Sequence, residues 1–98
     1  MGRAFYSEYV SHCLKFYVRH PNHKFHSDAD KNNWNACEAA FKEFTDSEKE
    51  ILFYIYNKGD AIPNNVYQIA KAKRIKQDSI WALLNSLEKK VAERRGLV

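Results

Sequence analysis

The chain has 98 residues, of which 45% are hydrophobic and 29% charged. This is the composition of one folded domain spanning residues 1–98 rather than of a disordered tail. Three glycines and two prolines leave little material for hairpins, so we expect an all-α fold of about five helices in a compact bundle. Two cysteines exclude a disulfide framework, and the net charge of +4 permits a polyanionic partner without requiring one.

No stretch of the sequence has the apolar length of a membrane span, and the first ten residues lack the pattern of a secretory signal. We therefore expect a cytoplasmic protein with reduced cysteines and no contact with a membrane. Cys13 and Cys37 both fall in apolar helical patterns, where a free cysteine acts as a small hydrophobic residue.

An N-terminal helical pair is expected within residues 1–44. The first helix covers residues 4–20 and must stop before Pro21, because the residue preceding a proline avoids the helical conformation. A polar loop follows. Ser27 or Asp28 can cap the second helix. The buried face of this helix is expected at the three- and four-residue spacing of Trp34, Cys37, Phe41 and Phe44.

Three further helices are expected in residues 45–98. Thr45 and Glu48 form a capping-box pattern at the start of the third, which Gly59 is expected to end. Its apolar side is formed by Ile51, Leu52, Ile55 and Tyr56. Pro63 suits the first turn of a fourth helix that runs to about Lys73. The fifth begins near Gln77 or Asp78, ends at Gly96, and carries an apolar side of Ile80, Leu83, Leu84, Leu87 and Val91.

The segment "VYQIAKAKRIKQDSIWALL", residues 66–84, has the spacing of a helix-turn-helix. Such a motif needs a small residue where its helices cross, and Ala70 is small. It needs apolar residues five and ten positions later, where Ile75 and Ile80 stand, with Ile69 and Leu83 as supports.

Two positions depart from that pattern. The turn position four after the small residue is usually glycine, because its backbone is left-handed, and here it is Arg74. Lys73 replaces a residue that is usually apolar. A non-glycine residue costs about 1 kcal/mol if the conformation is kept. The sequence leaves two alternatives, a kept turn or a reshaped corner.

The wider run "FTDSEKEILFYIYNKGDAIPNNVYQIAKAKRIKQDSIWALLNSLEKKV" resembles region four of bacterial sigma factors and its phage and mobile-element relatives. The resemblance covers about residues 44–95, and the two N-terminal helices lie outside it. It implies duplex DNA binding in transcription control, in a protein of a phage or conjugative element, and a contact with RNA polymerase.

In that family the start of the last helix enters the major groove. The positions expected to meet DNA here are Lys71, Lys73, Arg74, Lys76, Gln77, Asp78, Ser79, Ala82 and Asn85. The four cations among them suit phosphates, and the remaining polar side chains suit base edges. A plainer alternative is that the cations are solvated surface at a helix end and that Asp78 only caps the fifth helix.

Trp81 stands where the family has a polar or basic side chain. It can pack against the N-terminal helices, anchor a protein partner or stack on the DNA backbone, and packing is the favoured reading. If the N-terminal helices covered it, they would narrow the surface that faces DNA. The alternative function is a protein-interaction module built on a degenerate helix-turn-helix, with Trp81 and the aromatic N-terminal helices as its contact surface.

Other chemistry finds little support in the sequence. His20, His23 and His26 are spaced three apart, but paired ligands at zinc-site spacing are missing. The acidic residues are expected on exposed helical faces, and a glycine-rich phosphate loop is lacking. We therefore expect no enzyme activity, no cofactor, no metal and no small-molecule substrate.

Overall fold

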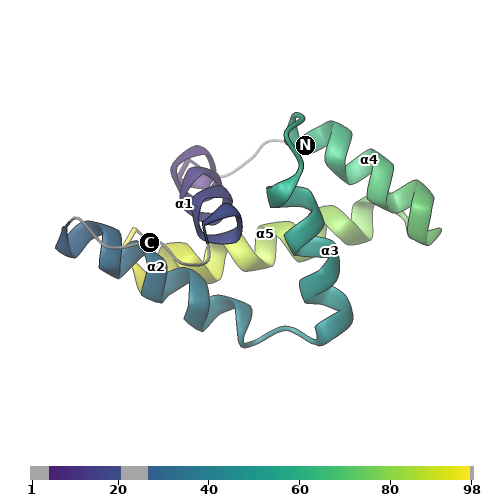
Figure 1. Cartoon of the computed structure of the whole chain (residues 1–98). Helices are drawn as coiled ribbons and strands as arrows, with labels where there is room; N and C mark the ends of the chain where they lie inside the picture. Colours follow the sequence, from purple (N-terminus) through teal and green to yellow (C-terminus); the bar gives the residue numbers. More distant parts are fainter. Residues whose placement is uncertain (1–4, 21–26, 98) are drawn as a thin grey trace.

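The computed structural model describes residues 5–20 and 27–97 and contains five α-helices and no strand in those ranges. The helices are α1 (Ser7–Arg19), α2 (Asp28–Phe41), α3 (Asp46–Asn57), α4 (Ile62–Lys73) and α5 (Gln77–Arg94), arranged as in Figure 1. The all-α prediction is confirmed. The expected stop of the first helix before Pro21 is confirmed as well.

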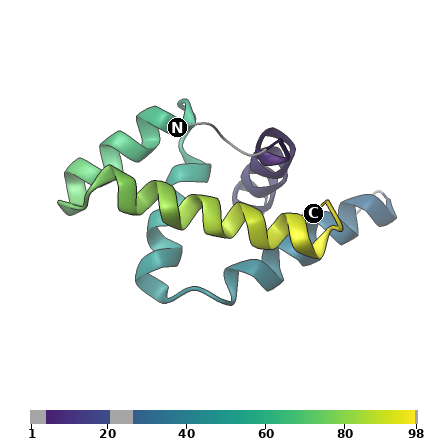
Figure 2. The same ribbon diagram turned by 180° about the vertical axis from the view of Figure 1, so that it is seen from behind.

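The longest helix, α5, packs against each of the other four. Figure 2 shows it running along one side of the molecule, which measures 40 × 28 × 24 Å. Ile80, Leu84, Leu87 and Val91 are each at most 1% exposed, as their helical spacing predicts. All five helices contribute to one continuous hydrophobic core.

The expected starts of the second, third and fourth helices are confirmed. The Thr45 hydroxyl accepts a hydrogen bond from the Glu48 amide at 3.2 Å, and the Glu48 carboxylate accepts one from the Thr45 amide at 2.9 Å. The Ser27 side chain caps α2 by accepting from the Asp30 amide at 3.1 Å. Pro63 lies in the first turn of α4. These contacts satisfy amide groups that have no partner within the helix.

α3 ends just before Gly59, as expected, but Gly59 is not left-handed and does not close the helix. The side chain of Asn65, only 1% exposed, instead donates to the carbonyl oxygens of Ile55 at 2.8 Å and Asp60 at 3.1 Å. Arg19 of α1 donates to the carbonyl oxygen of Lys58 at 2.7 Å. Side chains from two other helices therefore complete the end of α3.

Gly96 ends α5 as expected, with φ of 72°. The amide of Leu97 donates to the Ala92 carbonyl at 2.8 Å, and that of Gly96 donates to Glu93 at 3.2 Å. This is the pair of hydrogen bonds that closes a helix when a left-handed residue follows it.

Glu88 corrects the expectation that the acidic residues lie on exposed faces. It is 1% exposed in the middle of α5. Its Oε2 atom accepts hydrogen bonds from the Ser11 hydroxyl of α1 at 2.8 Å and from the Tyr56 hydroxyl of α3 at 2.7 Å. A buried carboxyl group needs such partners, so this contact ties three helices together.

The N-terminal pair is fastened to the C-terminal half of α5. The Arg95 guanidinium donates to Asn33 of α2 at 2.6 Å, and Glu43 pairs with Lys90 at 3.2 Å. Cys13 and Cys37 are free and buried between these helices, as expected. Burial raises the pKa of both thiols, that of Cys37 to about 12.

Within residues 5–20 and 27–97, none of the helices has the length and apolar character needed to cross a bilayer. The same part of the chain contains no cluster of three residues suited to holding a metal ion. His23 and His26 lie outside the described residues.

Replacing Asn65 by Ala is expected to lower the free energy of unfolding by about 2 kcal/mol, because buried carbonyl groups lose their hydrogen-bond donor. Chemical denaturation measures this change. The neighbouring Asn64 is exposed, so Asn64→Ala is the matched control and should stay within about 0.5 kcal/mol. Equal losses in the two variants would contradict the structural role assigned to Asn65.

Candidate nucleic-acid interface

α4 and α5 meet at a corner in which three residues, 74–76, join the two helices. Ile69, Ala70 and Ile80 are at most 5% exposed. Ile75 and Leu83 are half-buried and pack against the core. The five positions singled out by their spacing therefore all face inward.

Arg74 adopts the left-handed conformation, with φ of 55° and ψ of 45°. Its own amide and that of Ile75 both donate to the carbonyl oxygen of Ala70, the latter at 3.0 Å. Of the two alternatives left by the sequence, the turn is thus kept rather than reshaped. An arginine stands where the backbone favours glycine, at a cost of about 1 kcal/mol.

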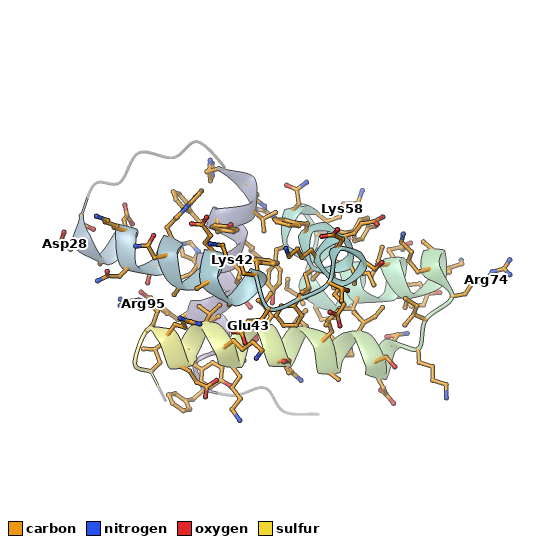
Figure 3. All side chains as sticks on the ribbon, turned by 90° about the horizontal axis from the view of Figure 1, so that it is seen from below. Asp28, Lys42, Glu43, Lys58, Arg74 and Arg95 are labelled. Carbon is orange, nitrogen blue, oxygen red and sulfur yellow. The ribbon has the colours of Figure 1, made fainter. Side chains whose placement is uncertain are left out.

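We call the four cations Lys71, Lys73, Arg74 and Lys76 the basic tip. All four are exposed. Figure 3 shows Arg74 extending away from the body of the molecule at the end opposite Asp28. The structure therefore gathers these charges around the turn between α4 and α5.

The other candidate residues lie in the first part of α5. Gln77, Asp78, Ser79 and Ala82 are exposed, and Asn85 is half-buried. Lys76 occupies the N-cap position of α5, and no side chain caps this end. The alternative that Asp78 is the cap residue is therefore wrong. Asp78 lies inside the first turn, where its charge is favourable to the helix dipole.

One cation of the basic tip has an intramolecular partner. The Lys73 ammonium lies 2.9 Å from Oε1 of Glu50, which projects from α3. No local sequence pattern indicates this ion pair, because its members are 23 positions apart on different helices.

Three further exposed residues extend the candidate surface beyond the positions chosen from the sequence. Ser86 and Lys89 follow Ala82 along α5 by four and seven residues, which places them on its face. Tyr67 is 48% exposed and lies one turn before Lys71 in α4. Helical spacing from the chosen residues was the signal that could have found them.

Trp81 is half-buried and packs against the hydrophobic core. The ring therefore packs, as predicted, and it does so against the core to which all five helices contribute. The N-terminal helices do not cover the basic tip: α1 and α2 pack on one another and on α3 or α5, without an extensive contact with α4. In Figures 1 and 2 they lie toward the end of the molecule away from the α4–α5 turn.

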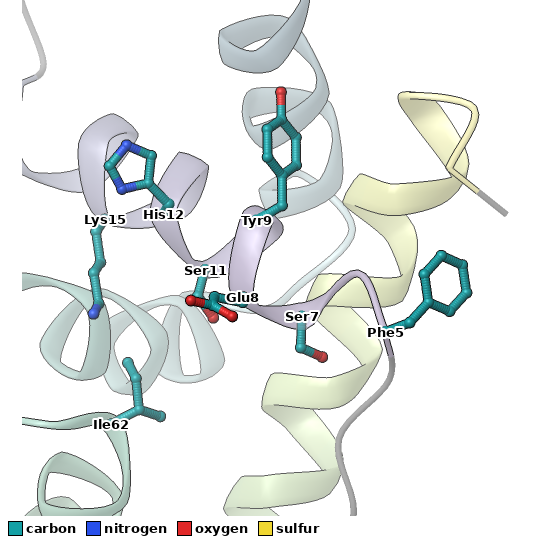
Figure 4. Close-up of a pocket in the computed structure, with 8 residues that line it drawn as sticks. All are labelled: Phe5, Ser7, Glu8, Tyr9, Ser11, His12, Lys15 and Ile62. Carbon is teal, nitrogen blue, oxygen red and sulfur yellow. The ribbon is translucent and has the colours of Figure 1, made fainter.

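An open groove of about 910 Å³ runs along α1 toward Ile62 at the start of α4. Glu8, His12 and Lys15 contribute polar groups to it. In Figure 4, Lys15 extends toward Ile62, whereas Tyr9 points away from it. These side chains do not converge on one point, so the groove adds no catalytic arrangement to the candidate site.

Comparisons with protein-family models, with curated proteins and with solved structures give no match for this chain.

Replacing Arg74 by Gly should raise the free energy of unfolding by about 0.5–1 kcal/mol, because glycine relieves the left-handed strain. The matched control is Ala72→Gly, which places the same residue in the helical part of α4 and should cost up to about 1 kcal/mol. Urea unfolding measures both. A destabilised Arg74→Gly protein would contradict the strain described here.

Trp81→Ala is expected to reduce the free energy of unfolding by about 1–3 kcal/mol, less than for a fully buried tryptophan, because the ring is half-exposed. Trp81→Phe keeps an aromatic ring against the core and should lose less. Thermal and chemical denaturation measure these differences. An unchanged stability of Trp81→Ala would assign the ring to a partner surface instead.

Proposed function

We propose that this protein binds duplex DNA through the basic tip and the first turns of α5, as a transcription regulator or sigma-like factor of a phage or conjugative element. The observation that carries the proposal is the turn at Arg74. Its left-handed backbone holds α4 and α5 in a tight corner and leaves four cations exposed around it. Charge and backbone geometry thus favour the same surface.

Base contacts would come from the start of α5. In a helix-turn-helix the second helix enters the major groove with its N-terminal residues against the base edges. Gln77 and Asn85 carry amides that suit adenine, and Ala82 suits a thymine methyl group. The exposure of the first turns of α5 supports this placement.

Phosphate contacts would come from the basic tip, which flanks the start of α5 on its α4 side. Lysine and arginine at such positions fix the register of a protein on the duplex and make its affinity depend on salt. The first turn of α5, which lacks a side-chain cap, adds the positive end of a helix dipole. A contact with RNA polymerase belongs to the proposal on the strength of the sequence resemblance alone.

The first experiment is a fluorescence-anisotropy titration of a mixed-sequence duplex of about 30 bp, at about 50 and about 200 mM salt. Four phosphate contacts predict a slope of roughly −3.6 for the logarithm of affinity against the logarithm of salt concentration. Lys73, Arg74 and Lys76 changed together to Ala should remove roughly 2.7 of this slope. Their exposure predicts a similar melting curve for the variant.

A matched control removes three exposed lysines outside the tip, Lys31, Lys42 and Lys58. It lowers the net charge equally, and it should keep most of the affinity and the steep slope. Absence of binding by the wild-type protein at about 50 mM salt would overturn the proposal. Equal losses in the two triple variants would place the DNA surface elsewhere.

The alternative function, a protein-interaction module, rests on exposed aromatic rings rather than on the cations of the basic tip. Phe53 and Tyr67 are 38% and 48% exposed on α3 and α4. With DNA binding absent, these two rings are the first side chains to replace in a search for a protein partner, because aromatic residues dominate the energetics of interfaces.

A further inference from the structure

We propose that Glu50 acts as an internal competitor of DNA phosphate: its carboxylate holds the Lys73 ammonium in the free protein and lowers the affinity of the basic tip for any duplex. The inference rests on the proposed function and adds to the same site a residue that weakens DNA binding.

The carboxylate of Glu50 occupies a position beside the Lys73 ammonium that a DNA phosphate would have to take in order to contact Lys73. Glu50 lies on the exposed side of α3, and Lys73 is the last residue of α4. Oε1 and Nζ are 2.9 Å apart, a distance typical of a charge-assisted hydrogen bond. In the described part of the chain, the other three cations of the tip form no ion pair.

In the ion pair between Glu50 and Lys73, the carboxylate can readily be replaced by a phosphate. The Glu50 side chain is 67% exposed and that of Lys73 is 41% exposed. Ion pairs at such exposed positions contribute little to stability, so a phosphate group can take over the ammonium at low cost. The anchoring of α3 and α4 to each other keeps the carboxylate close to the tip, because Asn65 of α4 bonds to the end of α3.

Two effects on DNA binding follow. A phosphate must displace the carboxylate before it gains the Lys73 contact, and the displaced carboxylate then stays near the duplex and repels it. Both effects lower affinity for every sequence. Glu50 therefore weakens the sequence-independent part of binding, which leaves the base contacts of α5 a larger share of the total.

The test is Glu50→Gln, which removes the charge and keeps the size of the side chain. At about 50 mM salt, affinity for the mixed-sequence duplex should rise roughly three- to tenfold. The salt slope should stay close to the wild-type value, because Lys73 contacts a phosphate in both complexes and only the competition for its ammonium is removed. Glu93→Gln, an equal charge change at an exposed site near the far end of α5, should raise the affinity by a clearly smaller factor.

Lys73→Gln separates competition from general repulsion. If Glu50 acts mainly through Lys73, Glu50→Gln should tighten binding much less when Lys73 is already Gln, because only the repulsion between Glu50 and the duplex is then removed. A tightening of undiminished size in this background, or one in the wild-type background that equals the effect of Glu93→Gln, would overturn the inference. Melting curves of the wild type and of the four variants verify that each is folded.

Measuring DNA binding by the wild type beside Glu50→Gln distinguishes a failure of this inference from a failure of the proposed function. Binding by the wild type, with no change in Glu50→Gln, overturns the role of Glu50 alone. Binding by Glu50→Gln but not by the wild type would support the competition by Glu50, but it would overturn DNA binding as the function of the native protein. Absence of binding by either protein at about 50 mM salt overturns the DNA-binding function and the inference with it.

Discussion

The buried carboxyl group of Glu88 fixes the arrangement on which the rest of the molecule depends. Its Oε2 atom receives hydroxyl groups from Ser11 of α1 and Tyr56 of α3, while its own helix, α5, contacts every other helix. A buried carboxyl group without partners is strongly unfavourable, so the three helices are held in the one register that satisfies it. The end of α3 is fixed in the same way by Asn65, which positions α4 and the turn at Arg74. The surface proposed to meet DNA thus depends on polar contacts made in the core.

Much of this fold follows from local sequence. The capping box at Thr45, the cap at Ser27 and the helical spacing along α5 were readable because each involves residues within one or two turns of a helix. Gly59 does not close α3, because the end of this helix is completed by side chains from other helices. Such tertiary contacts are not encoded in any local pattern. Glu88 was readable in part. It lies four residues after Leu84 and three before Val91, on the buried stripe of α5, so helical spacing could have indicated its burial, whereas its residue type led to the expectation of an exposed side chain.

The candidate interface also combines features that local sequence predicts with features that depend on tertiary contacts. The apolar positions of the corner were correctly located, since the spacing of Ala70, Ile75 and Ile80 is set by helix geometry. The left-handed conformation of Arg74 could not be predicted. This backbone is unfavourable for an arginine, and it is kept only when the surrounding contacts over-determine the turn. The pairing of Glu50 with Lys73 could not be predicted from the sequence, because it depends on how α3 lies beside α4. Whether these residues bind DNA stays a prediction.

The placement of the two cysteines and the two tryptophans gives the molecule separate reporters for its two halves. Both thiols are buried in the α1–α2 pair, and burial raises the pKa of each, so they react with alkylating reagents only when that pair opens. Trp81 lies in α5 near the corner, whereas Trp34 lies in α2. Thiol reactivity and the fluorescence of single-tryptophan variants can therefore be followed side by side. Coincident transitions would mean that the N-terminal helices and the corner unfold as one cooperative unit, and separated ones that the pair detaches while the corner persists.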